Sequence, residues 1–207
     1  MWHLMPPATR ALITTIGAVF LLQLVLGDVL LAWFALWPLG GAVQVPGPTT
    51  TGFLPWQLVT YSFLHGNFMH LLFNLFGLFM FGSDVERLFG RQRFLMYYFV
   101  SVVTAGIAQL VMSAVSGAPP YPTIGASGGV FGVLLAFGLY FPRRTILLIF
   151  PPIPMPARVF VFVYAAIELY LGVTGTQEGV AHFAHLGGMV GGFIMILYWR
   201  RRPPRRW

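Results

Sequence analysis

The chain has 207 residues and a formal net charge of +7, and 57% of its residues are hydrophobic while only 8% are charged. A soluble domain carries roughly a quarter charged residues, so this composition excludes an ordinary soluble domain and indicates helices in lipid. The absence of cysteine excludes disulfides, thiolate metal sites and a cysteine nucleophile. We expect one membrane domain over residues 1–207, with its core at about 55–199 and an Arg/Pro-rich tail at 200–207.

Six apolar runs predict the membrane-spanning helices. In chain order they are approximately Ala11–Leu31, Phe63–Gly82, Phe94–Val115, Gly125–Phe141, Arg158–Val173 and Val180–Trp199. A spanning helix needs about 20 residues, with about 17–25 tolerated, so the fourth and fifth runs lie near the short limit. The predicted fold class is therefore an all-α membrane protein, a bundle of six transmembrane helices.

The positions of the arginines predict the orientation of this bundle. All twelve cationic residues are arginines, in four clusters: Arg10; Arg87, Arg91 and Arg93; Arg143, Arg144 and Arg158; Arg200, Arg201, Arg202, Arg205 and Arg206. Six spans place every cluster and both termini on one side, and the opposite loops, at 32–62, 116–124 and 174–179, contain no Lys or Arg. The positive-inside rule then predicts an N-in, C-in topology with a long amphipathic first outer loop. The basic charge follows from this topology, with lipid headgroups and not nucleic acid as its partner.

Several polar residues in or beside the predicted spans are functional candidates, because polar groups are costly to hold in lipid. They are His65, His70, Asn74, Ser127, Glu168, His182 and His185. Since a helix rises about 1.5 Å per residue, Ser127 lies about 24 Å above the inner boundary, and His185 and His70 lie about 22 and 21 Å above it. This shared depth on three helices predicts one site in the outer half of the membrane.

Glycines follow the candidate serine and the last histidine at helical spacing. Gly188 and Gly192 follow His185 by three and seven residues and so line its helix face. Gly128 and Gly132 offer a matching face on the helix of the serine. Small residues at such spacing let two helix backbones approach closely, which would bring the serine and histidine side chains together.

Other interpretations of these polar residues stay open at this point. A serine in Gly-Ala-Ser-Gly-Gly is often only a packing residue, whereas the nucleophile elbow of α/β-hydrolases requires a preceding strand that this sequence does not predict. The four histidines in this set could together bind a metal, but no carboxylate-bearing zinc motif lies at their level. We therefore predict no metal and no cofactor. For Glu168, a contact with backbone or a neighbouring helix is favoured over a role in proton relay.

Four motifs in this order are similar to those of one known family. They are His-x4-His-x3-Asn at His65, His70 and Asn74, then "GSDVERLFG" at 82–90, Gly-x-Ser-Gly at 125–128 and Ala-His-x2-Gly-x3-Gly at 184–192. Together they resemble the rhomboid family of intramembrane serine proteases over approximately residues 55–199. One departure is Trp56-Gln57, where the family often shows Trp-Arg, at a position tied to loop stability and not to chemistry.

The resemblance implies a Ser–His dyad without a third acidic member. Ser127 would be the nucleophile and His185 the general base, and the only acidic residues of the motifs, Asp84 and Glu86, lie at the inner boundary. The resemblance further assigns oxyanion stabilisation to Asn74, His70 and the backbone N–H of the serine.

The remaining motif positions are expected to support the site. His65 resembles the family's structural histidine, which braces the first outer loop. Phe131 stands where relatives often have a tyrosine whose ring stacks on the catalytic histidine. Gly125, Gly188 and Gly192 complete the small positions of the serine and histidine motifs.

These observations predict an intramembrane serine endopeptidase that hydrolyses peptide bonds in or near transmembrane segments of single-pass membrane proteins. We expect a multi-pass protein of a bacterial-type cytoplasmic membrane, with its active site toward the outer face. Two alternatives are a non-catalytic rhomboid-like scaffold that binds transmembrane segments, and a small transporter. Retention of Ser127 and His185 argues against the scaffold, and the apolar spans below the site argue against the transporter. The oligomeric state and the roles of His182 and Glu168 stay open.

Overall fold

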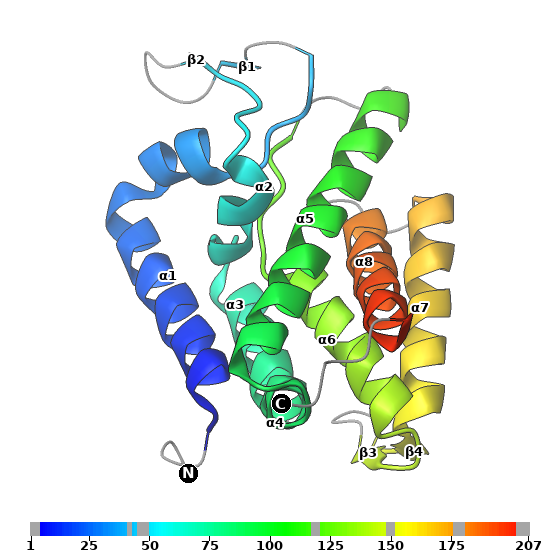
Figure 1. Ribbon diagram of the computed structural model, residues 1–207. Helices are drawn as coiled ribbons and strands as arrows, with labels where there is room; N and C mark the ends of the chain where they lie inside the picture. The colour runs from blue at the N-terminus through cyan, green and yellow to red at the C-terminus, as the bar shows by residue number, and fades with distance from the viewer. Residues whose placement is uncertain are drawn as a thin grey trace.

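The computed structural model describes residues 5–40, 43–44, 50–116, 121–147, 152–175 and 181–201, and this part of the chain is mainly helical (Figure 1). Its long helices are α1 (Pro7–Phe34), α5 (Arg91–Ser116), α7 (Ala157–Thr174) and α8 (His182–Arg201). The shorter helical elements are α2 (Gln57–Thr60), η2 (Tyr61–Phe63), α3 (Phe68–Gly77), the π-helical η3 (Leu78–Gly82), α4 (Ser83–Phe89) and α6 (Ser127–Tyr140). Two antiparallel hairpins pair β1 (Val43–Gln44) with β2 (Thr50–Thr51) and β3 (Thr145–Leu147) with β4 (Pro154–Pro156).

Five helical segments of the described chain are long and apolar enough to cross a membrane. They are Pro7–Phe34, Phe68–Phe89, Arg91–Ser116, Ala157–Thr174 and His182–Arg201. The second of them joins α3, η3 and α4 into one continuous segment, and α6 is apolar but has only 14 residues. A helix of that length rises about 21 Å, less than the hydrocarbon thickness of about 30 Å. The described chain is thus a helical membrane bundle with five candidate spans, and the count of six stays a prediction.

The fourth predicted run is short because its first residues are not helical. Thr123 pairs with Leu36 through two backbone hydrogen bonds, and the N–H of Gly125 donates to the carbonyl of Tyr61 at 3.0 Å. The chain before α6 is therefore not helical, and backbone hydrogen bonds to Leu36 and Tyr61 hold it in place. As a result, α6 starts inside the bundle, at Ser127, instead of at its surface.

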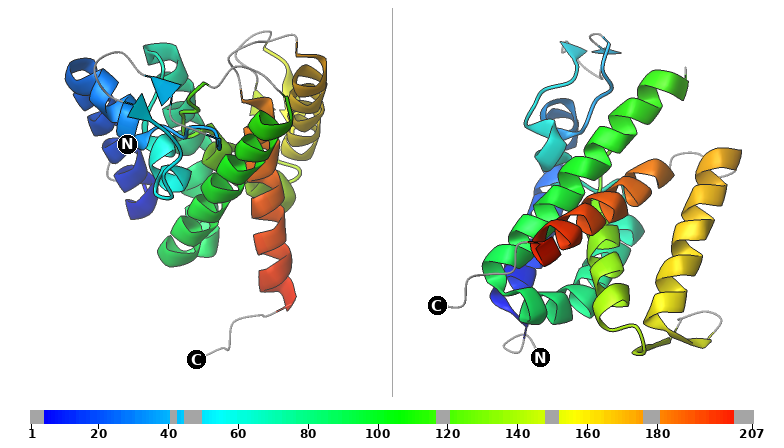
Figure 2. Two further views of the ribbon diagram at one scale, coloured as in Figure 1. Left: turned by 90° about the horizontal axis from the view of Figure 1, so that it is seen from above. Right: turned by 45° about the vertical axis from the view of Figure 1, so that its right-hand side comes forward.

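The helices α5, α6 and α8 form the closely packed centre, while α1 and α7 lie at opposite edges (Figures 1 and 2). A Cβ atom on Gly188 would collide with the carbonyl oxygen of Gly128, so α6 and α8 touch backbone to backbone. A Cβ atom on Gly192 would instead collide with the hydroxyl of Tyr97 on α5. Outward faces of the edge helices expose large apolar side chains, such as Val25 on α1 and Phe162 on α7, as helices in lipid do.

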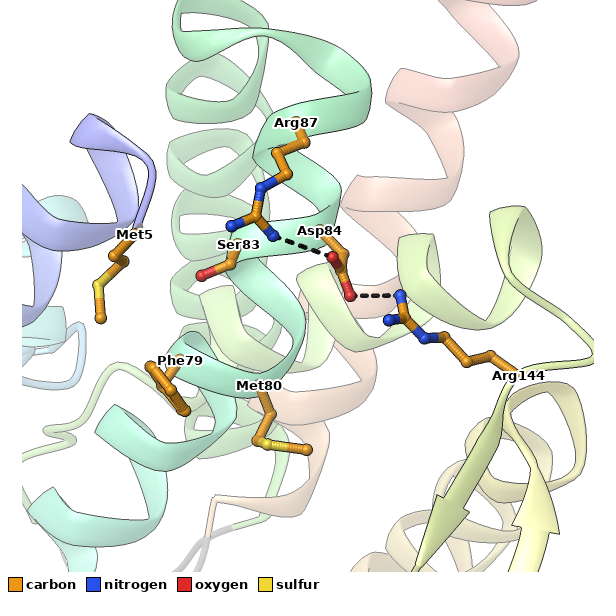
Figure 3. Close-up of a pocket in the computed structure, with 7 residues that line it drawn as sticks. All are labelled: Met5, Phe79, Met80, Ser83, Asp84, Arg87 and Arg144. Atoms are coloured by element: carbon orange, nitrogen blue, oxygen red, sulfur yellow. Dashed lines mark hydrogen bonds and ion pairs between the residues drawn. The ribbon is translucent and has the colours of Figure 1, made fainter. Parts of the chain in front are cut away.

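An ion-pair network joins elements at the end of the bundle opposite the β1–β2 hairpin, which we call the arginine end (Figures 1 and 3). Asp84 of α4 pairs with Arg87 at 3.2 Å and with Arg144 at 2.5 Å, across the connection that follows α6. These three residues line a pocket together with Met5, Phe79, Met80 and Ser83. None of the candidate site residues lines this pocket.

A buried carboxylate attaches α1 to α4 at the same end. Glu86 is 3% exposed and accepts hydrogen bonds from the backbone N–H groups of Ala8 at 2.9 Å and Thr9 at 2.6 Å. The hydroxyl of Thr9 donates to the same carboxylate at 2.8 Å. Because the first N–H groups of a helix have no intrahelical partner, Glu86 satisfies the N-terminus of α1 from another segment.

The segment between α1 and α3 is organised by Gln57, at the position where the family often has an arginine. Gln57 is fully buried, and its Oε1 accepts from the backbone N–H groups of Trp37 at 3.2 Å and Leu54 at 3.1 Å. Its Nε2 donates to the carbonyl oxygens of Gly52 at 3.2 Å and Trp33 at 3.4 Å. The glutamine therefore supplies loop-stabilising contacts of its own.

Candidate catalytic site

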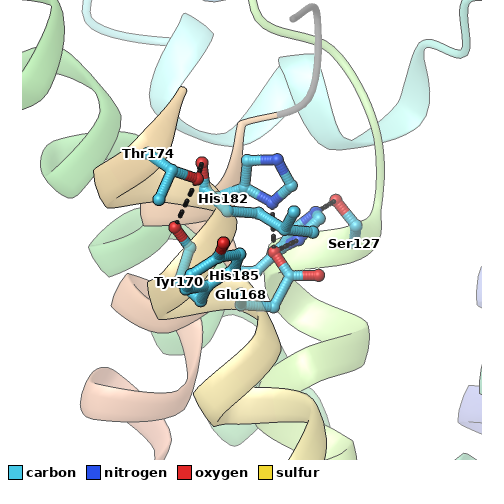
Figure 4. Close-up of polar contacts among 7 residues, drawn as sticks. Ser127, Glu168, Tyr170, Thr174, His182 and His185 are labelled. Carbon is cyan, nitrogen blue, oxygen red and sulfur yellow. Dashed lines mark hydrogen bonds and ion pairs between the residues drawn. The ribbon is translucent and has the colours of Figure 1, made fainter. Parts of the chain in front are cut away.

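The candidate nucleophile and base meet where α6 and α8 begin (Figure 4). Ser127 is the first residue of α6, and His185 lies in the first turn of α8. The Oγ atom of Ser127 lies 2.8 Å from Nε2 of His185, and the histidine is 8% exposed. At this distance a proton can pass directly between the two atoms. The structure thus brings together the serine and histidine that the sequence placed at one depth.

Gly125 shapes the turn that leads into α6. Its φ angle is +123°, in a region that residues with a side chain rarely adopt. A Cβ atom at this position would lie 2.6 Å from Nε2 of His70 and 3.7 Å from Oγ of Ser127. The glycine therefore lets the His70 ring of α3 approach the loop beside the serine.

Phe131 lies one turn after Ser127 on α6 and covers the imidazole of His185. The two rings are parallel within 4°, with their centroids 4.3 Å apart. The stacked ring excludes water from one face of the imidazole and limits its rotation. This is the position and the contact that the resemblance assigned to an aromatic residue.

Asn74 and His65 lie close to this centre but make different contacts. Asn74 is 5% exposed, and its amide donates to the carbonyl of His70 at 2.8 Å, so its part in oxyanion binding stays a prediction. His65 accepts the N–H of Ala126 at Nε2, 3.4 Å away. Its backbone N–H donates to Oε1 of Gln23 on α1 at 2.9 Å. His65 therefore braces the residue directly before the serine.

A carboxylate that the sequence analysis did not assign to the site lies beside His185. Oε2 of Glu168 on α7 is 2.8 Å from Nδ1 of His185 and 2.7 Å from Nδ1 of His182 (Figure 4). Glu168 is 8% exposed and His182 is 5% exposed. The expectation that no acidic group lies near the serine and histidine is therefore wrong.

The sequence carried one signal for this contact. An ionisable residue inside an apolar span is costly unless it is paired, so Glu168 required a partner within the bundle. What the sequence could not supply is the rotation of α7 about its axis, which points the carboxylate at α8 and not at α6. The depth estimate does not predict this contact. Glu168 lies only ten residues from Arg158, which places it closer to the inner boundary than Ser127 and His185.

Within the described ranges, one cluster of side chains could hold a metal ion. It consists of Glu168, His182 and His185, whose ligand atoms lie within 4.8 Å of one another. This cluster differs from the four-histidine set considered from sequence, because it contains Glu168 and lacks His65 and His70. The rings of His65 and His70 instead pack on each other, with centroids 5.0 Å apart. The distances of 2.7 and 2.8 Å from one carboxylate oxygen fit two N–H donors, and the expectation of no metal stays a prediction.

A family model and individual relatives, compared with this chain, indicate the same family. The family model described as Rhomboid domain matches residues 53–202. The chain is 34% identical over 141 residues to the rhomboid protease GluP of Bacillus subtilis, which covers 67% of this chain and 25% of that protein. It is 28% identical over 208 residues to the rhomboid protease GlpG of Yersinia pestis, which covers 97% of this chain and 65% of that protein. The chain thus spans less than two thirds of the length of these two relatives.

Apolar helices around a partly buried serine–histidine contact define an integral, multi-pass membrane protein with a candidate site inside its helical bundle. The match to the family model covers most of the chain, including both of these residues. The chain belongs to the rhomboid family.

Proposed function

We propose that this chain is an intramembrane serine endopeptidase in which Ser127 is the nucleophile and His185 the general base. The observation that carries the proposal is the distance of 2.8 Å between Ser127 Oγ and His185 Nε2 at the start of two packed helices. Two proteins to which the chain is similar are named rhomboid proteases, which supports the reaction class.

The geometry supports a two-step acyl transfer. The Ser127 hydroxyl attacks the scissile carbonyl carbon while its proton moves to Nε2 of His185. The same proton then passes to the leaving amine nitrogen as the peptide C–N bond breaks. Water then attacks the acyl carbon of the ester while it gives a proton to Nε2. That proton passes to Ser127 Oγ as the ester C–O bond breaks, which releases the second product as an acid and restores the serine and the neutral histidine.

The start of α6 supplies donors for the oxyanion. The first hydrogen bond of this helix runs from the N–H of Val130 to the carbonyl of Ala126. The N–H groups of the first three helical residues, 127–129, therefore have no carbonyl partner one turn earlier in the helix. They lie at the positive end of the helix dipole, beside the nucleophile. The N–H of Ser127 would therefore stabilise the negative oxygen, together with His70 and Asn74 of α3. Losing one such donor typically costs about 10²–10³ in rate.

The proposed substrates are single-pass transmembrane proteins cleaved in or near their membrane-spanning segments. A buried site among apolar helices suits a peptide that is itself apolar. We infer six spans in one membrane domain over residues 1–207, with both ends of the chain inside. The arginine end would face the cytoplasm and the site would lie toward the outer face of a bacterial-type cytoplasmic membrane.

The test is to label the purified protein in detergent with a fluorescent fluorophosphonate, which reacts with activated serines. Wild type is expected to be labelled at Ser127, Ser127→Ala to remain unlabelled, and His185→Ala to react at least about 10³-fold more slowly. The matched control is Ser101→Ala on α5, because Ser101 is a buried serine of the bundle that donates to the carbonyl of Tyr97 in its own helix. This variant should be labelled like wild type.

A second measurement connects labelling to proteolysis. Wild type and Ser127→Ala are incubated with a panel of single transmembrane segments in detergent, and product masses give the scissile bond. Equal cleavage by both proteins, or labelling of wild type at another serine, would show that Ser127 is not the nucleophile.

A further inference from the structure

We propose that Glu168 is a positioning residue for His185, so that the site works as a Ser127–His185–Glu168 triad and not as a dyad. The inference rests on the proposed serine protease function and adds to it a residue from α7. It assigns a role to a buried charge in an apolar helix, where an unpaired carboxylate would be strongly unfavourable.

The hydrogen-bond chemistry of the three side chains fixes the tautomer of His185. An ionised carboxylate only accepts hydrogen bonds, so at 2.8 Å the Nδ1 atom of His185 must carry the hydrogen that Glu168 Oε2 accepts. In a neutral imidazole the Nε2 atom is then unprotonated, and this atom faces Ser127 Oγ at 2.8 Å. Glu168 thereby holds the form of His185 that can take the serine proton.

The same contact stabilises the charge that forms during the reaction. When the serine proton reaches Nε2, His185 becomes an imidazolium that lies between the serine oxygen and the Glu168 carboxylate. Both Glu168 and His185 are 8% exposed, so water screens their attraction only weakly. Glu168 stays ionised throughout, because the proton leaves from Nε2 to the departing amine and not from Nδ1.

His182 holds the carboxylate in place. Its Nδ1 atom lies 2.7 Å from the same oxygen, Oε2, that contacts His185. A carboxylate oxygen has two acceptor sites, so both imidazoles can donate to it at once. Since His182 precedes His185 by three residues on α8, the two rings approach Glu168 from one helix face. The carboxylate therefore has little freedom to rotate away from His185.

A purely structural role for Glu168 predicts different results. The carboxylate also links α7 to α8 at the edge of the bundle, where a Cβ atom on Gly172 would lie 3.1–3.2 Å from Phe183 and His182. If Glu168 only held α7 in place, its loss would lower stability and would impair substrate binding as much as the chemical step. The readout must therefore separate the reactivity of Ser127 from the stability of the fold.

The kinetic experiment uses fluorophosphonate labelling of the full chain in detergent, with the maximal rate kinact and the half-saturating concentration KI measured separately. Glu168→Gln keeps the shape of the side chain but removes its charge, and its amide can donate to Nδ1 and so select the wrong tautomer. We expect kinact to fall about 10²–10⁴-fold with KI nearly unchanged, by comparison with the aspartate of the soluble serine protease triad. Glu168→Asp, which keeps the charge, should regain part of the lost rate.

The matched control is Glu86→Gln, the same change at the second carboxylate that is buried in the described part of the chain. It should lower the thermal stability and leave kinact as in wild type. The proposal is overturned if wild type is labelled at Ser127 and Glu168→Gln is labelled equally fast, or if Glu86→Gln loses as much kinact as Glu168→Gln. Failure of wild type itself to react at Ser127 would instead contradict the proposed function.

A spectroscopic measurement tests the tautomer directly. The chain has five histidines, so selective ¹⁵N-histidine labelling gives a tractable NMR spectrum. Nδ1–H protons that donate to Glu168 should resonate far downfield in wild type and move upfield or vanish in Glu168→Gln. His185→Ala should remove one of these signals and His182→Ala the other. A wild-type spectrum without a downfield signal that depends on both Glu168 and His185 would overturn the triad.

Discussion

The described part of the chain buries two carboxylates, Glu86 at the arginine end and Glu168 beside Ser127, and it satisfies them with different donors. Glu86 accepts from two backbone N–H groups and one hydroxyl at the N-terminus of α1. Glu168 accepts from two imidazole rings on α8. Each carboxylate joins two helices, which are distant in sequence for Glu86 and consecutive for Glu168. Burial alone does not distinguish the two groups.

The difference lies in what the donors can do. Backbone N–H groups and a threonine hydroxyl keep their hydrogens at every ordinary pH, so the contacts of Glu86 can only hold structure. Imidazole nitrogens exchange protons, and one of the two rings also contacts the serine. A carboxylate whose partners titrate can therefore influence reactivity, whereas one with fixed donors contributes only to the stability of the fold. The predictions below separate these two effects.

The largest expected effect comes from forcing α6 and α8 apart with Gly188→Val. A side chain at this position meets the backbone of Gly128, which cannot move as a flexible side chain would. We expect a loss of about 1–3 kcal/mol or more in stability from overpacking, and loss of Ser127 labelling. Gly17→Val on α1 is the control, because nothing lies within 4 Å of a Cβ atom there. Labelling at Ser127 is compared for the two variants on the same gel. Normal labelling of Gly188→Val would show that the reactive serine does not depend on the close contact between α6 and α8.

The sequence predicts the close contact between α6 and α8, but it does not predict every part of the site. The spacing of Gly128 and Gly188 from the serine and histidine indicated a close approach of their helices. Apolar runs located the long helices to within a few residues. The start of α6 was placed two residues early, because the extended segment before it is held by Leu36 and Tyr61, which are distant in sequence.

The contact of Glu168 shows what sequence periodicity leaves open. A helix in lipid carries apolar residues on all sides, so its sequence does not reveal which face turns inward. The orientation of α7 depends on its packing against α6 and α8, and this packing follows from the whole bundle. The sequence indicated that Glu168 needed a partner, whereas only the arrangement of α7 and α8 identifies His182 and His185.

A smaller effect, confined to stability, is expected from Glu86→Gln. The amide offers one acceptor oxygen and places an N–H donor against donors of α1, so at least one buried hydrogen bond is lost. We expect a loss of about 1–3 kcal/mol in unfolding free energy, seen as a lower midpoint of thermal unfolding in detergent. The rate of Ser127 labelling at 25 °C should not change. A slower labelling rate in a folded Glu86→Gln protein would show that the arginine end influences the site, and the contrast between the two carboxylates would fail.

The smallest effect is expected from Phe131→Leu, which removes the stacked ring but no polar contact of His185. Stacked aromatic pairs contribute about 0.5–1.5 kcal/mol beyond their burial, so labelling should slow about two- to tenfold. Phe131→Tyr keeps the stack and should react at nearly the wild-type rate. If Phe131→Leu is as impaired as Glu168→Gln, ring packing and not the carboxylate orients His185. A small loss with leucine and a large one with Glu168→Gln would mean that hydrogen bonding selects the reactive form of the imidazole, with stacking only limiting its motion.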